Sequence, residues 1–166
     1  MQTKDKKTDD DCQPDWNLLE GKSVTYLLVL ELDRNIELTV GCKGTYAMQA
    51  GSYAYIGSAK RNAKHRLRRH WQGDGRLKWH IDYLRREARS TGLWVFDSTV
   101  LAECQLALLI AGEQEIEIPV ARFGASDCRC PAHLFFGAGV SKISNRLQNL
   151  PGFFYSFQAN GMKNKQ

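Results

Sequence analysis

The sequence predicts an α+β fold, in which a small, mostly antiparallel sheet is covered by flanking helices. Three observations carry this prediction. Short segments rich in β-branched and aromatic residues recur along the chain. In the first part of the chain, only short turn-like stretches lie between successive segments of this kind. Longer segments with a helical spacing of apolar residues follow. With 166 residues and a hydrophobic fraction of 43%, the chain has the size of one domain with its own core.

The first part of the chain is expected to form several successive strands. Residues 24–32 (VTYLLVLEL) are the most apolar of these segments, and Asp33-Arg34-Asn35 has the composition of a turn. A hairpin with the alternating segment 36–42 is therefore expected. The remaining strands are expected over residues 45–48, 52–56, 93–100 and 134–136.

Four helices are expected, over residues 62–72, 78–88, 101–111 and 140–150. Asn62 is the expected cap of the first helix. Apolar residues at helical spacing mark the inward faces of the first two helices: Ala63, Leu67 and Trp71 on one, and Ile81 and Leu84 on the other.

One domain is expected over residues 23–150, between a flexible N-terminal segment (1–22) and a disordered C-terminal tail (151–166). No segment approaches the roughly 18 consecutive apolar residues of a membrane span. No apolar stretch typical of a signal peptide follows the polar N-terminus. The sequence thus predicts a cytoplasmic protein with no membrane partner. Its five cysteines, an odd number, favour reduced thiols or a metal over a disulfide framework.

Positive charge is concentrated in one part of the chain. Residues 60–89 contain 11 Lys or Arg and 3 Asp or Glu, a balance of +8, whereas the whole chain carries +5 and the remainder therefore −3. Such segregation attracts polyanions, although a solvated helix face would have the same composition. The candidate nucleic-acid contacts are Gly57, Lys60, Arg61, Lys64, Arg68, Arg69 and Arg85, with Trp71 and Trp79 as candidate stacking surfaces for bases.

A second group of residues has the chemistry needed to cleave a phosphodiester. The run Tyr55-Ile56-Gly57 is followed by Arg66 on the basic helix, and Glu103 is the only charged residue of the apolar segment 101–111. A phenol can transfer a proton, a guanidinium can hold a phosphate, and a carboxylate can bind a hard cation. Gly57, if it adopts a positive φ at the end of its strand, would also let a phosphate approach backbone N–H groups.

With Tyr26 on the preceding strand, this ordering resembles the GIY-YIG nuclease superfamily. The resemblance covers roughly residues 23–136, and it is to a little-characterised branch found alone or fused to glycosylases of the endonuclease III type. The second motif of the family is intact as Tyr55-Ile56-Gly57, whereas the first is reduced to Val24-Thr25-Tyr26 and has lost its glycine. A hairpin is inserted between the two motifs. Tyr46 competes with Tyr26 for the place of the first tyrosine, and Tyr26 is favoured because its strand is longer and more apolar.

The resemblance implies a metal-dependent endonuclease that acts on DNA. Tyr26, Tyr55 and Arg66 would be catalytic, and Glu103 would hold one Mg²⁺ or Mn²⁺ ion. Judged from the residues alone, Glu103 could instead be an acid in the first turn of a helix, where the helix dipole favours it. His70, four residues after Arg66, could relay a proton or contact phosphate, or it could be a half-buried residue of an amphipathic helix.

Two segments typical of this branch leave alternatives open. His80 and Asp82 in Trp79-His80-Ile81-Asp82-Tyr83 could help hold substrate, or His80 could simply cap local structure. Cys128, Cys130 and His133 could bind zinc with a fourth ligand from Cys42, Cys104 or Asp127. They could equally form a loop with reduced thiols, from which Asp127 or His133 contacts the site. The alternatives to a nuclease are therefore a non-catalytic nucleic-acid-binding module on the same fold and a zinc-stabilised interaction domain.

Overall fold

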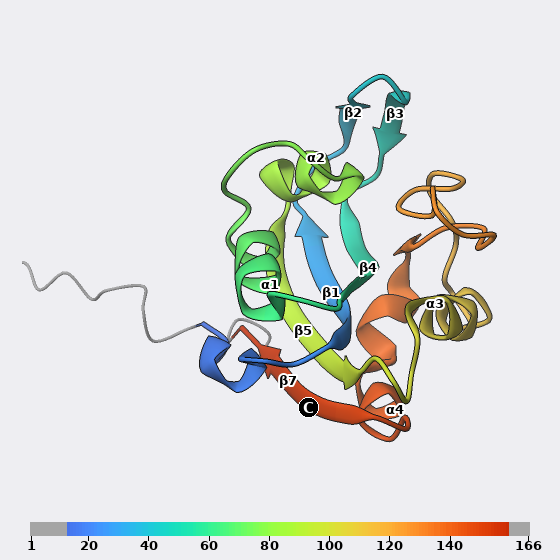
Figure 1. Ribbon diagram of the computed structural model, residues 1–166. Helices are drawn as coiled ribbons and strands as arrows, with labels where there is room; N and C mark the ends of the chain where they lie inside the picture. Colours follow the sequence, from blue (N-terminus) through green and yellow to red (C-terminus); the bar gives the residue numbers. More distant parts are fainter. Residues whose placement is uncertain (1–12, 160–166) are drawn as a thin grey trace, which may run out of the picture.

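The computed structural model describes residues 13–159 and confirms the α+β class (Figure 1). Among these residues, no helix combines the length and the apolar character needed to cross a bilayer. The expectations for residues 1–12 and 160–166 lie outside the described part of the chain.

A five-stranded antiparallel sheet forms the centre of the fold, with the order β6-β4-β1-β5-β7. The central strand, β1 (Val24–Leu32), pairs along its whole length with β4 (Gly51–Ala59) and also with β5 (Arg89–Asp97). β6 (Leu134–Phe136) and β7 (Phe153–Gln158) form the two edges. The expected strand over 45–48 does not belong to this sheet.

Helices cover both faces of the sheet, because the side chains of each strand alternate between two separate cores. In Figure 1 the green helices α1 (Ala63–Gln72) and α2 (His80–Glu87) lie on one side of the sheet. The residues expected to face inward from these helices are all buried there: Ala63, Leu67, Trp71, Ile81 and Leu84.

The opposite face is covered by α3 (Glu103–Ala111), the 3-10 helix η3 (Ala138–Lys142) and α4 (Ser144–Gln148). The buried side of α3 consists of Leu106, Ala107 and Ile110. These residues pack with Leu27, Ile56, Trp94 and Phe96 from the three central strands.

The inserted hairpin forms a second sheet of its own. β2 (Ile36–Val40) pairs antiparallel with β3 (Gly44–Met48), and Figure 1 shows both strands projecting beyond the end of the central sheet. Leu38, Val40 and Met48 are buried in the core that also contains α2. The hairpin is therefore fixed to the domain by its apolar side.

The expectations for the two ends of the chain were partly wrong. Phe153–Gln158, placed in a disordered tail, form β7 on the edge of β5. Their aromatic residues pack against the sheet, which the polar composition of the following residues obscured in the sequence. The helix expected over 140–150 is divided between η3 and α4, and within the expected flexible segment Trp16–Leu19 form a 3-10 helix with Leu19 fully buried.

The beginning of α1 also differs from its expected form. Asn62 adopts the left-handed conformation at φ 55°, and its side chain makes no capping hydrogen bond. Asparagine tolerates this conformation better than most residues. The carbonyl oxygen of Asn62 still accepts the first helical hydrogen bond, from the N–H of Arg66, so the helix begins where expected.

Candidate active site

A polar pocket of about 170 Å³ lies at the end of the sheet where β1 begins and β4 approaches its end. It brings together all five residues expected to be catalytic, although they come from four separate elements. Its lining consists of Tyr26, Tyr55, Gly57, Ser58, Arg66, His70, Trp79, Glu103, Gly124 and Asp127.

Tyr26, and not Tyr46, shares the pocket with Tyr55. The centroids of the Tyr26 and Tyr55 rings are 6.3 Å apart, and the Tyr26 hydroxyl lies 2.7 Å from Nδ1 of His70. Tyr46 instead donates a hydrogen bond from its hydroxyl to the carbonyl oxygen of Lys43, inside the inserted hairpin. The structure therefore brings Tyr26, the favoured candidate, to Tyr55 and leaves Tyr46 in the hairpin.

Gly57 has a different structural role from the one expected. It does not end its strand and has no positive φ, because β4 continues to Ala59. It lies directly across from Tyr26 in the β1–β4 register, where an added Cβ would come within 2.5 Å of Tyr26 Cζ and Oη. Glycine is thus required here to leave room for the phenol.

His70 connects Tyr26 with a pair of charges behind it. The imidazole is 3% exposed, and its Nε2 lies 3.3 Å from Arg69 Nη2 and 3.6 Å from Asp82 Oδ1. Asp82 is fixed in turn, because its Oδ2 accepts hydrogen bonds from the backbone N–H groups of Lys78 and Trp79 at the start of α2. The phenol of Tyr26 is therefore continuous with a buried polar network.

Arg66 is held at the wall of the pocket. Its Nη1 donates a hydrogen bond of 2.6 Å to the carbonyl oxygen of Ser58, and its Cζ lies 5.3 Å from the centroid of the Trp79 ring. The carbonyl and the aromatic face restrict a side chain that would otherwise be mobile. The remaining guanidinium donors stay available for an anion in the pocket.

Glu103 is the first residue of α3, where the helix dipole favours an acid, and it also lines the pocket. Its position therefore agrees with both interpretations made from the sequence. Its Oε2 accepts a hydrogen bond of 2.6 Å from the Ser58 hydroxyl, and its Oε1 lies 2.9 Å from His133 Nδ1. Burial raises the pKa of Glu103, but the contact with the His133 imidazole, the hydrogen bond from Ser58 and the charge of Arg66 together lower it by more, so the net change is a decrease. The carboxylate is therefore ionised at neutral pH.

The phenols and the imidazole of the pocket are held in their neutral forms. Burial, followed by the proximity of Tyr55, raises the pKa of Tyr26 well above its ordinary value. Burial and the charge of Glu103 raise the pKa of Tyr55. Burial is also the main cause that lowers the pKa of His70 to about 4. Neutral His70 can therefore exchange a proton with Tyr26.

The basic segment is less uniformly available than its composition suggests. Arg85 donates to the carbonyl oxygens of His70, Trp71 and Ala88, so it joins α2 to the end of α1. Lys64 is paired with Glu20 and Asn17, and Arg69 with Asp82.

Arg85, Lys64 and Arg69 are therefore each paired with other groups of the protein. Of the remaining candidates for a nucleic-acid surface, Lys60, Arg61 and Arg68 are exposed. Trp71 is also removed, because it is 7% exposed and packs between Trp16 and Phe157. Trp79 is 37% exposed and remains a candidate stacking surface.

The two segments typical of the branch meet beside the pocket. His80 Nδ1 accepts a hydrogen bond of 3.3 Å from the N–H of Gly124, so His80 supports the loop over the pocket. Gly124 has φ +72°, and an added Cβ would lie 3.1 Å from the Tyr55 ring. Asp127 is exposed and reaches the pocket from this loop.

Of the three residues expected as a fourth ligand, Cys104 is the one that lies with Cys128, Cys130 and His133. The ligand atoms of Cys104, Cys128, Cys130 and His133 all lie within 4.8 Å of one another. Cys42 is exposed in the turn of the inserted hairpin and takes no part.

Ser58 is a site residue that the sequence did not single out as such, whereas Asp82, expected as a candidate substrate contact, instead contacts His70 behind the pocket. Ser58 follows Tyr55-Ile56-Gly57 directly and contacts both Arg66 and Glu103. Its position next to this motif was the feature of the sequence that could have identified it. Asp82 lies at the third position of α2, where an acid is usually explained by helix capping. It does cap the helix, and its second role depends on the packing of α1 against α2.

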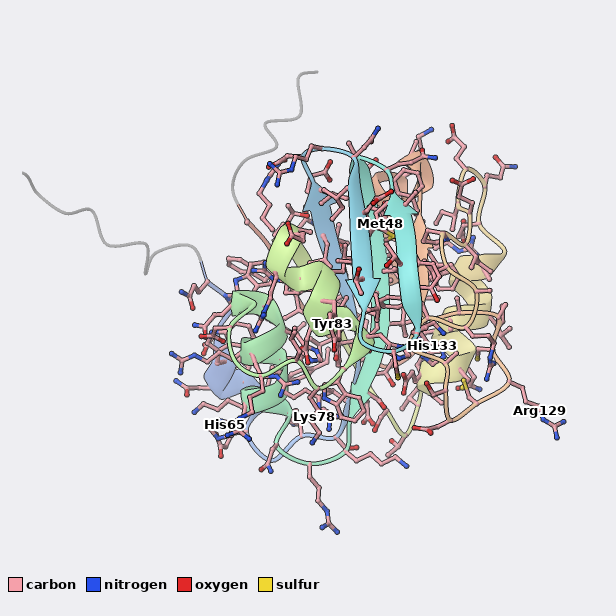
Figure 2. All side chains as sticks on the ribbon, turned by 90° about the horizontal axis from the view of Figure 1, so that it is seen from above. Met48, His65, Lys78, Tyr83, Arg129 and His133 are labelled. Carbon is pink, nitrogen blue, oxygen red and sulfur yellow. The ribbon has the colours of Figure 1, made fainter. Side chains whose placement is uncertain are left out.

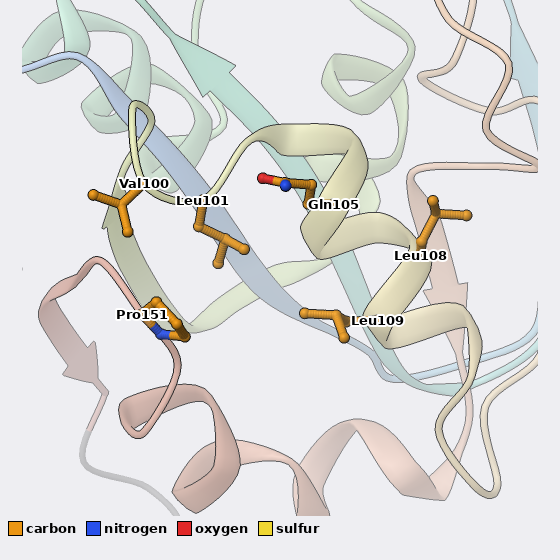
Figure 3. Close-up of a pocket in the computed structure, with 6 residues that line it drawn as sticks. All are labelled: Val100, Leu101, Gln105, Leu108, Leu109 and Pro151. Carbon is orange, nitrogen blue, oxygen red and sulfur yellow. The ribbon is translucent and has the colours of Figure 1, made fainter.

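A larger hollow, of about 520 Å³, has none of this chemistry. Figure 3 shows its lining on the outer side of α3 and the adjoining loops, with mostly aliphatic side chains: Val100, Leu101, Gln105, Leu108, Leu109 and Pro151. The smaller polar pocket is therefore the candidate active site.

A family model described as a domain of unknown function, DUF123, matches residues 25–152 of the chain. Neither the curated proteins nor the solved structures gave a match. The matched segment contains every residue that lines the polar pocket, together with the Cys/His group.

Proposed function

The chain belongs to the DUF123 family, and we propose that it is a metal-dependent endonuclease that hydrolyses phosphodiester bonds in DNA. The observation that carries this proposal is the convergence of two tyrosines, an arginine, a histidine and a glutamate in one polar pocket. The order of these residues along the chain and their positions also support a place in the GIY-YIG nuclease superfamily.

Glu103 fits the role of ligand for a Mg²⁺ or Mn²⁺ ion. Each of its oxygens has one protein partner, so each retains a lone pair for a cation. Hard divalent ions prefer such oxygen ligands and are often bound by a single carboxylate with water and substrate phosphate. A divalent ion bound there supplies Lewis-acid polarisation of the scissile phosphate and stabilises the charge on the leaving oxygen.

Arg66 would bind the phosphate undergoing cleavage. Its side chain is already oriented by Ser58 and Trp79, so little conformational entropy is lost on binding. Positive charge fixed at this place stabilises the additional negative charge of the transition state.

Tyr26 and His70 would move the proton of the attacking water. The raised pKa of Tyr26 argues against a free phenolate at neutral pH. In the proposed path, water gives its proton to Tyr26 while Tyr26 passes its own proton to neutral His70 across the 2.7 Å contact. Asp82 then lies close enough to stabilise the imidazolium.

Glu103→Gln tests the proposal, because it preserves shape but removes the anionic ligand. With Mg²⁺ or Mn²⁺, the wild type should nick plasmid DNA, and the variant should lose this activity while binding DNA and unfolding as the wild type does. Glu37→Gln, at an exposed position on β2, is the matched control and should remain active.

Tyr26→Phe and Tyr46→Phe form a second matched pair. Loss of the proton-transferring hydroxyl should reduce the nicking rate by about 10²-fold or more in Tyr26→Phe and hardly at all in Tyr46→Phe. A wild type that binds DNA but does not nick it with either metal would instead indicate a non-catalytic binding module. Full activity of Glu103→Gln would contradict the metal role of Glu103.

A further inference from the structure

Four potential metal ligands from separate segments of the chain converge next to the candidate active site. Cys104 is the second residue of α3, Cys128 and Cys130 lie in the loop that follows Phe123, and His133 directly precedes β6. Figure 1 shows α3 beside this loop. We propose that these four residues bind one zinc ion, and that the ion holds His133 in the orientation that positions Glu103.

The spacing of the ligand atoms suits a tetrahedral ion. With Zn–S of about 2.3 Å and Zn–N of about 2.0–2.1 Å, a sulfur and a nitrogen at two corners of a tetrahedron would be about 3.6 Å apart. The Cys128 Sγ to His133 Nε2 distance is 3.5 Å. All the ligand atoms lie within 4.8 Å of one another, so a contraction of about 1 Å would bring the widest pair to a tetrahedral edge.

Hydrogen bonds within the loop hold these ligands in place. The Arg122 guanidinium donates to the carbonyl oxygens of Cys128 and Cys130, which brings the two cysteines to one side of the turn. The backbone of His133 is fixed by a 2.8 Å hydrogen bond from its N–H to the carbonyl oxygen of Phe123. Figure 2 shows Arg129, between the two cysteines, extending away from the molecule, whereas His133 lies in the interior near α3.

The donor set selects the metal. Three thiolates and one imidazole form a soft, four-coordinate set that is typical of structural zinc and leaves no open position for a substrate. Mg²⁺ and Mn²⁺ prefer oxygen ligands, so they are expected at Glu103 and not in this cluster. The four described cysteines are all free thiols, which leaves the three in the cluster available to a metal.

His133 joins the cluster to Glu103 through its two ring nitrogens. Nε2 faces Cys128, while Nδ1 lies 2.9 Å from Glu103 Oε1. A histidine that binds zinc through one nitrogen commonly donates the N–H of the other to a carboxylate, and this contact fixes the orientation of both side chains. In this way a closed zinc site would determine where Glu103 points.

Metal analysis of the purified full chain tests the zinc site without reference to activity. Wild-type protein should contain about one zinc per chain, and Cys128→Ser and Cys130→Ser should each lose most of it. Cys42→Ser, outside the cluster, and Glu103→Gln should both retain it. Absence of zinc from wild-type protein, even after incubation with Zn²⁺, would overturn the proposal.

A second measurement keeps all four ligands in place and so does not depend on the folding of the cluster variants. In a Cys12→Ser, Cys42→Ser background, only the three cluster cysteines remain to react with a thiol reagent. They should react slowly in the zinc-loaded protein and rapidly once a chelator has removed the metal. Equal reactivity in both states, or an intact mass two hydrogens lower that indicates a disulfide, would also overturn it.

The positioning of Glu103 by the zinc site rests on the proposed function. It is measured separately, as the affinity for Mn²⁺ in electron paramagnetic resonance. Removing zinc, followed by removal of the chelator, should weaken Mn²⁺ binding by about 10- to 100-fold, as is usual when the partner of a ligand is lost. Unchanged affinity would contradict the positioning role while leaving the zinc site intact. Equal Mn²⁺ binding by zinc-loaded wild type and Glu103→Gln would contradict the proposed function alone.

Discussion

At the scale of single residues, the candidate site depends on a pair of positions facing each other on β1 and β4. Tyr26 requires space over the sheet, and Gly57 provides it because it has no Cβ. The glycine missing from the first motif is replaced by Val24, which is buried in a hydrophobic core and does not line the pocket. The position of the missing glycine therefore takes no part in lining the pocket, whereas the packing of Tyr26 depends on Gly57.

Gly57→Ala should reduce activity without a change in DNA binding. The new methyl group would lie 2.5 Å from the Tyr26 phenol and displace it from His70. Displacement by about 1 Å can cost about 10²-fold in rate, and we expect a decrease of that order in plasmid nicking. Gly112→Ala is the control, because its Cβ would have ordinary contacts of 3.6 Å and φ is −87°. Wild-type rates in Gly57→Ala would show that Tyr26 need not contact His70.

His70 should make the stability of the protein depend on pH. Its pKa is lowered to about 4 by burial, against about 6.5 in an unfolded chain. Between these values the unfolded state binds more protons, so stability should decrease as the pH falls from about 6.5 towards 4.

The comparison that isolates this effect is the loss of Tm between pH 7 and pH 5 in matched variants. It should be smaller in His70→Gln than in the wild type, whereas His65→Gln, exposed on the same helix (Figure 2), should behave as the wild type does. An identical loss in wild type and His70→Gln would mean that His70 is not held neutral in the folded protein.

At the scale of elements, α1 combines three functions on three sides. Leu67 and Trp71 are buried in the core, Arg66 and His70 line the pocket, and Arg68 faces solvent. The helical period of 3.6 residues separates these sides, and it was sufficient to predict the buried side from the sequence. It could not distinguish an arginine that lines the pocket, as Arg66 does, from one that supports the fold, as Arg85 does.

The exposed arginines should account for the salt dependence of DNA binding. If about six phosphates are contacted, log K should fall against log salt concentration with a slope of roughly −5 on duplex DNA. Replacing both Arg61 and Arg68 by Ala should weaken binding and reduce the slope by about 2. Arg34→Ala, exposed in the turn beyond the other end of β1, should change neither quantity. A slope near zero in the wild type would exclude the nucleic-acid function.

At the scale of the whole molecule, a hydrophobic core lies on each face of the sheet, and the strand β7 forms one of its edges. β7 pairs with β5, Phe157 packs edge-on against Trp71 at 5.4 Å, and the Tyr155 hydroxyl accepts a hydrogen bond from the N–H of Asp15. The two ends of the described chain are thereby joined beside α1, although they are far apart in sequence.

Phe157→Ala should consequently destabilise the whole domain. Truncating a buried phenylalanine costs about 3–5 kcal/mol, and for this half-buried ring we expect about 2 kcal/mol, or about 4–8 °C in Tm. Phe154→Ala, at a side chain that is 41% exposed, should cost less than about 1 kcal/mol. Thermal unfolding of the two variants provides the comparison, and equal Tm values would contradict an integral role for β7.

The sequence by itself determined the fold class and the strands and helices between residues 24 and 136, because alternation and helical period are local properties of the chain. The resemblance in motif order singled out the two tyrosines, Arg66 and Glu103 as one group. The sequence did not determine β7, the confinement of Arg85 and Trp71, or the association of Cys104 with Cys128, Cys130 and His133. These features depend on which segments pack against one another, since Arg85 contacts carbonyl oxygens 14 and 15 residues away and Cys104 lies 24 residues before Cys128. A side chain has the same local sequence whether it faces solvent, a neighbouring helix or a metal, and only the tertiary structure decides among these surroundings.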